Sequence, residues 1–365
     1  MKVNLSDVLE GCILRSDVFS KSEKPIMPKK TVLTPLHLEV LKAFNIQAID
    51  VEEILNHGAP FHPSHRKRDA VEKETNDRSI STTHSEAIED YLEAVTLFKE
   101  QFMNWQKGQA VAYLEMKTML SPLIHTFIKD PKQALTLYHY CQQEEYLYHH
   151  SVSVALLSAL LAKKLKYDSK AVLDIGFAGL LADAGLAKLP PRLLKKMTDL
   201  NDYDIKQFKQ HPVFGYQMLK KDPRVHEGIL LGVLQHHEKE DGSGYPLGIK
   251  GTQLHPYSKI IAVVDYFHAM ICSRPHHPKY PLYKALESLK NDRFSKYDSR
   301  IVRCFFEDVL HVSIGTKVRL TNQEVGEIIY VDTNDPTRPI LRMEGEQTLS
   351  LKDHKDLFID DILSI

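Results

Sequence analysis

The stretch Ser85–Leu310 keeps the periodicity of amphipathic helices almost without interruption, and this feature limits the possible folds most strongly. In Ala87–Gln106 apolar residues recur every three or four positions, which indicates a helix with one buried face. Val152–Leu165 and Val172–Ala184 are apolar nearly all round, as expected for helices inside a bundle. The sequence therefore predicts a mainly α protein whose central part, residues 87–310, is a helical bundle.

Further helices are expected at regular intervals through this stretch. We predict Ala110–Leu120, Leu123–Ile128, Lys132–Cys141, a helix running from an N-cap at Asn201 through Leu219, Ile229–His237, Ile260–Cys272, Pro281–Lys290 and Arg300–Leu310. Pro122 marks a break between the first two.

The pattern changes on both sides of the bundle. Residues 1–56 predict a small α+β module, with strands at Gly11–Leu14, Val18–Phe19 and Ile46–Val51 and a helix over Thr34–Phe44. Residues 57–86 are mostly polar and predict a linker. Residues 311–365 predict a small β module with strands at Lys317–Leu320, Glu327–Val331, Ile340–Met343 and Thr348–Leu351, and with a turn at Asn334-Asp335-Pro336.

Composition excludes some classes of function. The chain has 365 residues with 47 Lys and Arg against 48 Asp and Glu, a formal net charge of -1. No global basic field therefore favours nucleic acid or a membrane surface as partner. The four cysteines are widely spaced, and we expect reduced thiols and a cytoplasmic location.

Ionisable residues on these apolar helices are costly to bury unless they are paired or bind metal. Six of them have residue types that bind metals: His150, Asp183, His211, His236, His237 and Asp265. Each alone is more simply explained as a satisfied core residue, so the sequence leaves their convergence open. Together, imidazole and carboxylate ligands suit iron, manganese or zinc.

The loop Asp241–Pro246, which follows the His236-His237 pair, is more specific and is here called the Gly-Tyr-Pro loop. Gly242 and Gly244 allow close backbone approach and positive φ. Tyr245 offers a face on which a base can stack and a hydroxyl for a phosphate. A plain turn would explain the glycines but not their position directly after two histidines.

The run HHEKEDGSGYPLGIKG, His236–Gly251, closely resembles the motif of HD-GYP domains, a branch of the HD phosphohydrolases. The matching motifs extend from about Tyr148 to Phe306. The HD-GYP-like domain that contains them is expected to start near residue 130 of the helical region. The resemblance is carried by His150-Ser151-Val152, Leu180–Gly185, Leu189-Pro190, His211-Pro212 with Gly215, Val264-Asp265 with Ala269-Met270, and Ser273-Arg274-Pro275. Such domains are helical bundles that bind two or three metal ions and hydrolyse the bacterial second messenger cyclic di-GMP.

The resemblance implies a role for each matched position. His150, Asp183 and Asp265 would bind a first metal, Asp183 would bridge as a catalytic residue, and His211, His236 and His237 would complete the second site. Tyr245 and Gly244 would lie beside the substrate, and Arg274 would face a phosphate or guanine. The implied cofactor is one or two divalent ions, iron or manganese first, and the implied ligand is cyclic di-GMP or a related nucleotide.

The sequence departs from the family where the first metal and the phosphate are bound. Ala182 stands where the family has its name-giving His, and Leu186 stands where it has a Lys. His276-His277 replace an expected Tyr-Lys, and Tyr146 replaces the Glu of members with a third metal.

Three nearby residues could compensate for these losses. His268 lies one helical turn from Asp265 and is the better substitute ligand, whereas His149 is rotated away from His150. Lys188 is close in sequence to the missing Lys, but it lies beyond Gly185.

Two interpretations stay open. We favour a nucleotide-responsive scaffold with weakened or lost turnover, which passes a signal to a protein partner through its terminal modules, because both losses affect transition-state groups. The alternative is an active metal-dependent cyclic di-GMP phosphodiesterase. A metal-free interaction domain is a third interpretation, which the intact histidine set disfavours. A homodimer through Ala87–Gln106 also stays open.

Overall fold

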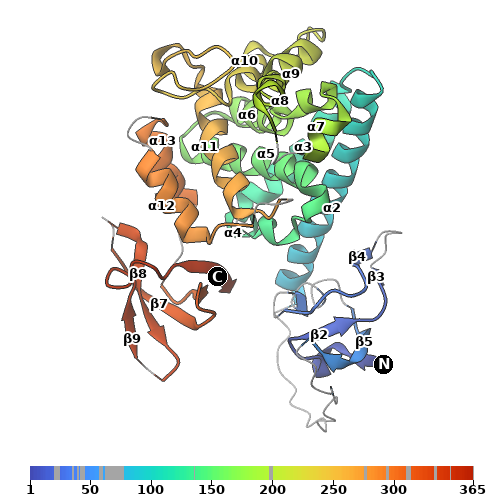
Figure 1. The fold of residues 1–365 in the computed structure, drawn as a ribbon, viewed down its shortest axis with the longest axis vertical. Coiled ribbons are helices and arrows are strands. Elements are labelled where there is room, and N and C mark those ends of the chain that lie inside the picture. The colour runs from blue at the N-terminus through green and yellow to red at the C-terminus, as the bar shows by residue number, and fades with distance from the viewer. Residues whose placement is uncertain are drawn as a thin grey trace. The chain divides into compact units, whose positions relative to one another are not determined.

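A computed structural model gives the fold of the chain (Figure 1). It describes residues 1–364 except 20–24, 35–36, 39–40, 42–45, 57–60, 62–77, 135, 197–199, 275–277, 293–295, 310–313, 333–334 and 346. The chain divides into two compact units, Met1–Glu89 and Asp90–Ile365. The mainly α fold with small flanking α+β and β modules is confirmed. None of the described helices is both long and apolar enough to cross a bilayer.

The N-terminal module is built on short antiparallel strands. β1 (Lys2–Asn4), β5 (Ala48–Leu55) and β2 (Cys12–Leu14) form one sheet in the order β1-β5-β2, and β3 (Val18–Phe19) pairs with β4 (Pro25–Met27). Alternate residues of β5, Ile49 and Val51, are buried, as expected for a half-buried strand. Of the predicted helix Thr34–Phe44, His37, Leu38 and Leu41 are helical, and most of the others lie outside the described residues.

Helix α2 (Arg78–Gln106) starts earlier than predicted, inside the segment assigned as a linker. Extending an existing helix by one residue costs far less than nucleating a new one, so polar residues join a helix that is anchored further along. The anchor is its apolar stripe, because Tyr91, Phe98 and Trp105 are fully buried within this chain. A homodimer would therefore need a surface other than this stripe.

The bundle occupies the larger unit, and α5 and α6 lie at its centre (Figure 1). Its helices are α3 (Tyr113–Lys129), α4 (Pro131–Ala134), α5 (Tyr146–Lys164), α6 (Ser169–Leu181), α7 (Pro191–Lys196), α8 (Asp202–Phe208), α9 (His211–Leu219), α10 (Glu227–Gln235), α11 (Pro256–Ile271), α12 (Leu282–Asp292) and α13 (Ser299–Cys304). Short 3-10 turns, including η2 (Leu137–Tyr140), η3 (Gln143–Glu145) and η4 (Ala184–Lys188), connect some of them, and a π-helical turn (Phe305–Val309) follows α13. At Gly179 a side chain would lie 3.2 Å from the Val154 carbonyl oxygen, so glycine permits the close packing of α6 on α5.

Pro122 does not break the helix as predicted, because α3 runs through it. Proline inside a helix costs about 3 kcal/mol. Leu120, Leu123, Ile124 and Phe127 on either side are buried, and each contributes about 1.5–3 kcal/mol on burial. Packing of the continuous apolar face therefore outweighs the lost backbone hydrogen bond.

The helix predicted from Asn201 through Leu219 is two helices. The Asn201 side chain accepts a hydrogen bond from the Asp204 N–H, which confirms the N-cap, but α8 ends at Phe208. A second helix, α9, starts at His211, and Pro212 occupies its first turn. Proline has no N–H to continue the α8 ladder but suits a helix start, so the chain turns here.

The C-terminal module is a five-stranded antiparallel sheet in the order β10-β6-β7-β8-β9. Its strands are β6 (Lys317–Leu320), β7 (Val325–Asp332), β8 (Asp335–Met343), β9 (Thr348–Ser350) and β10 (Ile359–Ser364). The four predicted strands are present. Of the predicted turn Asn334-Asp335-Pro336, Asp335 and Pro336 begin β8, and Asn334 lies outside the described residues. β10 was not predicted, because its two adjacent aspartates, Asp360 and Asp361, hide the apolar alternation of the strand. Tyr138 in the bundle donates a hydrogen bond of 2.6 Å to Asp361 in β10, which fastens the module to the helices.

Candidate metal and nucleotide site

The six predicted ligand side chains converge on one place. His150 lies in α5, and Asp183 lies two residues after the end of α6. His211 begins α9, His236 and His237 follow α10, and Asp265 lies in α11. They form two overlapping groups, each with ligand atoms within 4.8 Å of one another, and Asp183 belongs to both. Five separate elements thus contribute to a single constellation.

Gly185 explains why Asp183 reaches the start of α9. A Cβ added to Gly185 would lie 1.9 Å from the His211 carbonyl oxygen and 2.5 Å from the Gly215 nitrogen. Only glycine fits such a close backbone crossing. The turn after α6 therefore packs directly on α9, and Asp183 Oδ1 lies 3.2 Å from His211 Nε2.

The first group joins His150, Asp183 and Asp265. His150 Nε2 lies 2.9 Å from Asp265 Oδ1 and 3.7 Å from Asp183 Oδ2. The imidazole and the two carboxylates thus face one point from three elements. Ala182, buried beside Asp183, offers no donor atom, so among the described residues this group has three ligands where the family pattern has four.

The second group joins Asp183 to His211, His236 and His237. His211 Nδ1 donates to the Phe208 carbonyl at 2.8 Å, and His236 Nδ1 donates to the Val233 carbonyl at 2.7 Å. In the neutral rings the Nε2 atoms then carry lone pairs, yet they lie only 3.3 Å apart. Two lone pairs aimed at each other repel unless a cation lies between them, so this donor set fits a metal ion.

Electrostatics favour the metal-binding protonation states of Asp183, Asp265, His236 and His237. Burial by itself would raise the pKa of Asp183, but hydrogen bonding and charge from His211 lower it to about 2. The pKa of Asp265 is lowered to about 2 in the same way by His150. Burial and neighbouring histidines lower the pKa of His236 and His237. Ionised carboxylates beside neutral imidazoles are the forms that coordinate divalent ions.

The Gly-Tyr-Pro loop is held against the second group. The Tyr245 ring lies 4.7 Å from the His237 ring, and its N–H donates to the His237 carbonyl at 3.2 Å. A Cβ at Gly244 would come within 2.4 Å of Glu238 Cα, so Gly244 serves close packing. Gly242 has φ +81°, whereas Gly244 is not in the left-handed region, which corrects that part of the prediction.

Arg274 lies next to the first group, not in it. Its guanidinium carbon is 5.5 Å from the centre of the Tyr146 ring, and that ring stacks on His150. The Arg274 Nε atom is buried without a hydrogen-bond partner, so it is available to a ligand. The neighbouring His276-His277 lie outside the described residues.

An open cavity of about 830 Å³ begins beside the first group. Tyr146 and Leu186 line it, together with aromatic residues such as Phe102 and Tyr148. This volume is in the range of small-molecule sites. Leu186 therefore gives the cavity an apolar wall at the position where the family pattern has the ammonium group of a lysine.

The three residues considered as substitutes point elsewhere. The Tyr91 hydroxyl lies 2.9 Å from Nδ1 of His149, which faces α2 as expected. His268 lies behind His150, with its Nδ1 3.0 Å from His150 Nδ1, so it is a neighbour of a ligand and not a member of either group. Lys188 lines the same open cavity as Leu186, but its ammonium donates to the Trp105 carbonyl at 2.7 Å.

His149 makes the stability of the metal-free chain pH-dependent. Burial lowers the pKa of His149 to about 4, below the ordinary value of 6.5. The unfolded state therefore binds more protons than the folded state below pH 6.5, and the free energy of unfolding falls as the pH drops towards 4. The expected loss is about 3 kcal/mol.

Chemical denaturation with chelator at pH 7 and pH 4 tests this. His149→Gln keeps a hydrogen-bonding group near Tyr91 but does not titrate, so it should lose about 3 kcal/mol less than wild type. The exposed His125→Gln is the matched control and should behave as wild type. Equal losses in wild type and His149→Gln would contradict the prediction.

Two residues of the site, Glu238 and Lys209, had no role assigned to them from the sequence. The buried Glu238 accepts hydrogen bonds from the Leu247 N–H at 2.6 Å and the Gly248 N–H at 3.1 Å, and so holds the Gly-Tyr-Pro loop. Lys209 places its ammonium 5.2 Å from the centre of the Tyr245 ring. A carboxylate beside a histidine pair was a usable signal for Glu238. No sequence signal pointed to Lys209, because Tyr245, the residue that it contacts, is distant in sequence.

Comparison with known proteins agrees with this geometry. The HD domain family matches residues 138–301. A cyclic di-GMP phosphodiesterase of Pseudomonas aeruginosa is 27% identical over 77% of this chain and 66% of its own length. A cyclic di-GMP phosphodiesterase of Thermotoga maritima is 32% identical over 44% of each chain. The chain thus spans less than two thirds of either relative.

Other matches concern a different nucleotide and the fold. A 3'3'-cGAMP-specific phosphodiesterase of Vibrio cholerae is 29% identical over 41% of this chain and 32% of its own length. The solved structure of an HDG"Y"P protein from Bdellovibrio bacteriovorus superposes with a TM-score of 0.53 over 85% of this chain and 99% of that one. At 15% identity this likeness concerns the fold alone. Taken with the converging histidines, the two carboxylates and the Gly-Tyr-Pro loop, the family match and the curated relatives support an HD-GYP domain in residues 138–301.

Proposed function

We propose that this chain is a signalling protein that holds divalent metal and binds cyclic di-GMP, with turnover weakened or lost. The proposal rests on one observation: the metal ligands of the site are present, but two of its expected polar groups are replaced by apolar residues. Six ligand side chains converge, whereas Ala182 and Leu186 are apolar where the family pattern has a ligand and a cation. The relatives named as cyclic di-GMP phosphodiesterases support this class of nucleotide.

The two groups would hold one or two ions, with Asp183 supplying an oxygen to each group. Mixed imidazole and carboxylate donors suit iron or manganese. Bound ions would supply Lewis-acid stabilisation of the charge that develops on a phosphodiester. The protein's own part is to hold the donors, to keep the imidazoles of His236 and His237 neutral and to keep Asp183 and Asp265 ionised.

The surroundings of the two groups suit a nucleotide. Tyr245 would offer an aromatic face, and Lys209 beside it would attract a phosphate. Arg274, with its buried and unpartnered Nε, would pair with a phosphate or with the edge of a guanine. The cavity beside Tyr146 has the size and apolar walls that a planar base requires.

Turnover would be weak because positive charge is missing where it stabilises a transition state. Leu186 lines the cavity with an apolar side chain. Lys188, the nearest lysine in sequence, is committed to the Trp105 carbonyl. A chain of this kind would bind the nucleotide and report it, and the contact between Tyr138 and Asp361 would couple the bundle to the C-terminal module and a protein partner.

An active cyclic di-GMP phosphodiesterase is the second candidate function. Asp183 and the whole second group are present, and Lys209 supplies a cation on the same face as Tyr245. Metal analysis together with hydrolysis assays on manganese- or iron-loaded protein separates the two. Robust hydrolysis that Asp183→Ala abolishes would refute the scaffold and establish the enzyme.

Tyr245→Ala is expected to weaken cyclic di-GMP binding by about 10- to 100-fold, since stacking of a base on an aromatic ring contributes about 1–3 kcal/mol. Calorimetric titration of the metal-loaded chain with cyclic di-GMP measures the loss. Metal content should stay at the wild-type value, because Tyr245 contacts the His237 ring without belonging to either ligand group.

The exposed Tyr330 in β7 provides the matched control, and Tyr330→Ala should bind as wild type. Tyr245→Phe should retain most of the affinity if the aromatic face matters more than the hydroxyl. Unchanged binding by Tyr245→Ala, or no saturable binding by wild type, would refute the nucleotide part of the proposal.

A further inference from the structure

We infer that His268 is a positioning residue for His150: it accepts a hydrogen bond from Nδ1 of His150 and so turns Nε2 towards Asp265 and the first metal. The two Nδ1 atoms lie 3.0 Å apart, and His150 Nε2 lies 2.9 Å from Asp265 Oδ1 on the opposite side of the ring. The inference rests on the metal site of the proposed function. It concerns a side chain that belongs to neither ligand group.

A neutral imidazole carries its proton on one nitrogen only. For Nε2 of His150 to offer a lone pair to a metal, its proton must lie on Nδ1, and that N–H needs an acceptor. Histidine ligands in metal sites usually donate this N–H to a partner that fixes the ring. His268 offers such an acceptor in the tautomer with its own proton on Nε2, which leaves the lone pair on Nδ1, 3.0 Å from His150 Nδ1.

Tyr146 is the other group close to His150 Nδ1, with its hydroxyl at 3.2 Å. However, the Tyr146 and His150 rings are stacked, with an interplanar angle of 25°. An imidazole N–H lies in the plane of its ring, so a stacked partner is poorly placed to accept from it. The shorter contact and the tilted His268 ring, at 55° to His150, favour His268.

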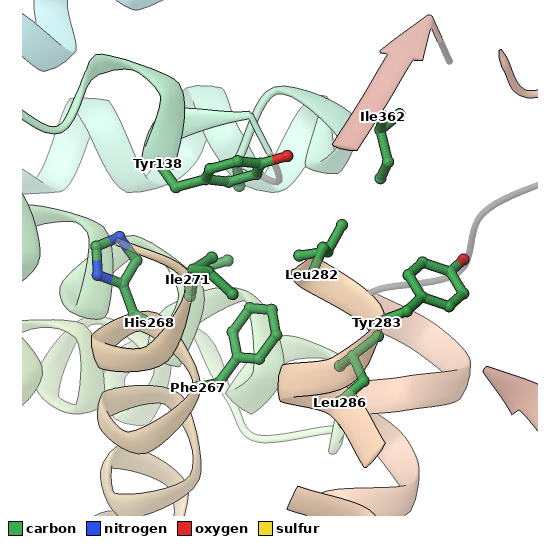
Figure 2. A pocket seen from close by; sticks show the side chains of 10 residues that line it. Tyr138, Phe267, His268, Ile271, Leu282, Tyr283, Leu286 and Ile362 are labelled. Atoms are coloured by element: carbon green, nitrogen blue, oxygen red, sulfur yellow. The ribbon is translucent and has the colours of Figure 1, made fainter. Parts of the chain in front are cut away.

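The surroundings of His268 hold it in place. Figure 2 shows it at one end of a small cavity, with Phe267 and Ile271 nearby and Ile362 of β10 at the other end. The cavity has about 10 Å³, the lower limit for one water molecule, and its other lining residues are mostly apolar. Just past the end of α11, Cys272 Sγ lies 3.6 Å from the His268 ring nitrogens. Bulk water therefore cannot easily replace His268 as the acceptor.

The test is a titration of the metal-free full chain with Mn²⁺, followed by calorimetry, and with Co²⁺, followed by its visible spectrum. The binding component that disappears in His150→Ala defines the first site. His268→Leu keeps the volume but removes the acceptor, and it should weaken this component by about 10- to 100-fold. His268→Asp restores an acceptor and should recover it, together with the Co²⁺ spectrum. The component that disappears in His211→Ala should be unchanged in both variants.

Three results would overturn the inference. The first is a His268→Leu variant that binds metal at the first site as tightly as wild type. The second is loss of first-site metal binding in Tyr146→Phe while His268→Leu keeps it. The third is a wild-type chain in which no metal-binding component depends on His150. The inference would also be overturned if His268→Asp failed to recover first-site metal binding and lowered the melting temperature of the metal-free chain. That result would assign His268 a packing role. Nucleotide binding is not part of these measurements, so failure of the cyclic di-GMP proposal would be distinguishable.

Discussion

Asp183→Ala is expected to release metal from both ligand groups at once. Asp183 is the residue that the two groups share, with Oδ1 3.2 Å from His211 Nε2 and Oδ2 3.7 Å from His150 Nε2. Its loss should weaken metal binding by more than the roughly 10- to 100-fold typical of outer partners of metal ligands. Elemental analysis after dialysis and Mn²⁺ titration would measure the loss.

Asp174→Asn provides the matched control. Asp174 is a buried carboxyl in α6, the helix that ends just before Asp183, and burial raises its pKa. This variant should keep wild-type metal content. If Asp183→Ala retained the wild-type number of ions, the shared site would be refuted.

The double variant Ala182→His with Leu186→Lys is expected to raise the rate of cyclic di-GMP hydrolysis by about 100-fold or more. Losing one electrostatic stabiliser in an active site typically costs about 10²–10³ in rate, so restoring one should recover a comparable factor. Ala182 directly precedes Asp183 in the chain. Leu186 lines the open cavity, so a longer lysine side chain has room there.

The single variants separate the two contributions in a hydrolysis assay with manganese. Ala182→His should mainly raise metal affinity, whereas Leu186→Lys should mainly raise the rate with metal bound. Leu186→Met serves as a control of similar length without charge and should leave the rate unchanged. A folded, metal-loaded double variant no faster than wild type would refute the account of lost turnover. So would wild-type hydrolysis that is already robust.

The fold could be predicted from the sequence wherever burial leaves a regular pattern. The helices of residues 87–310 follow the 3.6-residue period of their apolar positions, and β6 to β9 follow alternation. Predictions failed where packing outweighed a local signal. Pro122 lies inside α3 because residues on both sides are buried, and β10 forms because β6 offers an edge to pair with.

The sequence predicted which residues could form the candidate site, but not how their side chains are arranged in space. Imidazoles and carboxylates on apolar helices had to be paired or to bind metal, so His150 and Asp265 could be singled out from the sequence. Their convergence depends on contacts between distant elements, such as the crossing of Gly185 over His211. The direction in which each side chain points could not be predicted from the sequence either. Lys188 follows the missing lysine by two residues, yet it points to Trp105.

The sequence by itself therefore determined the helical class, the ligand types and the two missing groups, because these depend on local periodicity and on residue identity. Only the tertiary structure decided that Asp183 is shared, that His149 faces Tyr91, and that His268 stands behind His150. These are distances between side chains separated by up to 118 positions. Packing of whole helices sets such distances, and no short stretch of sequence encodes them.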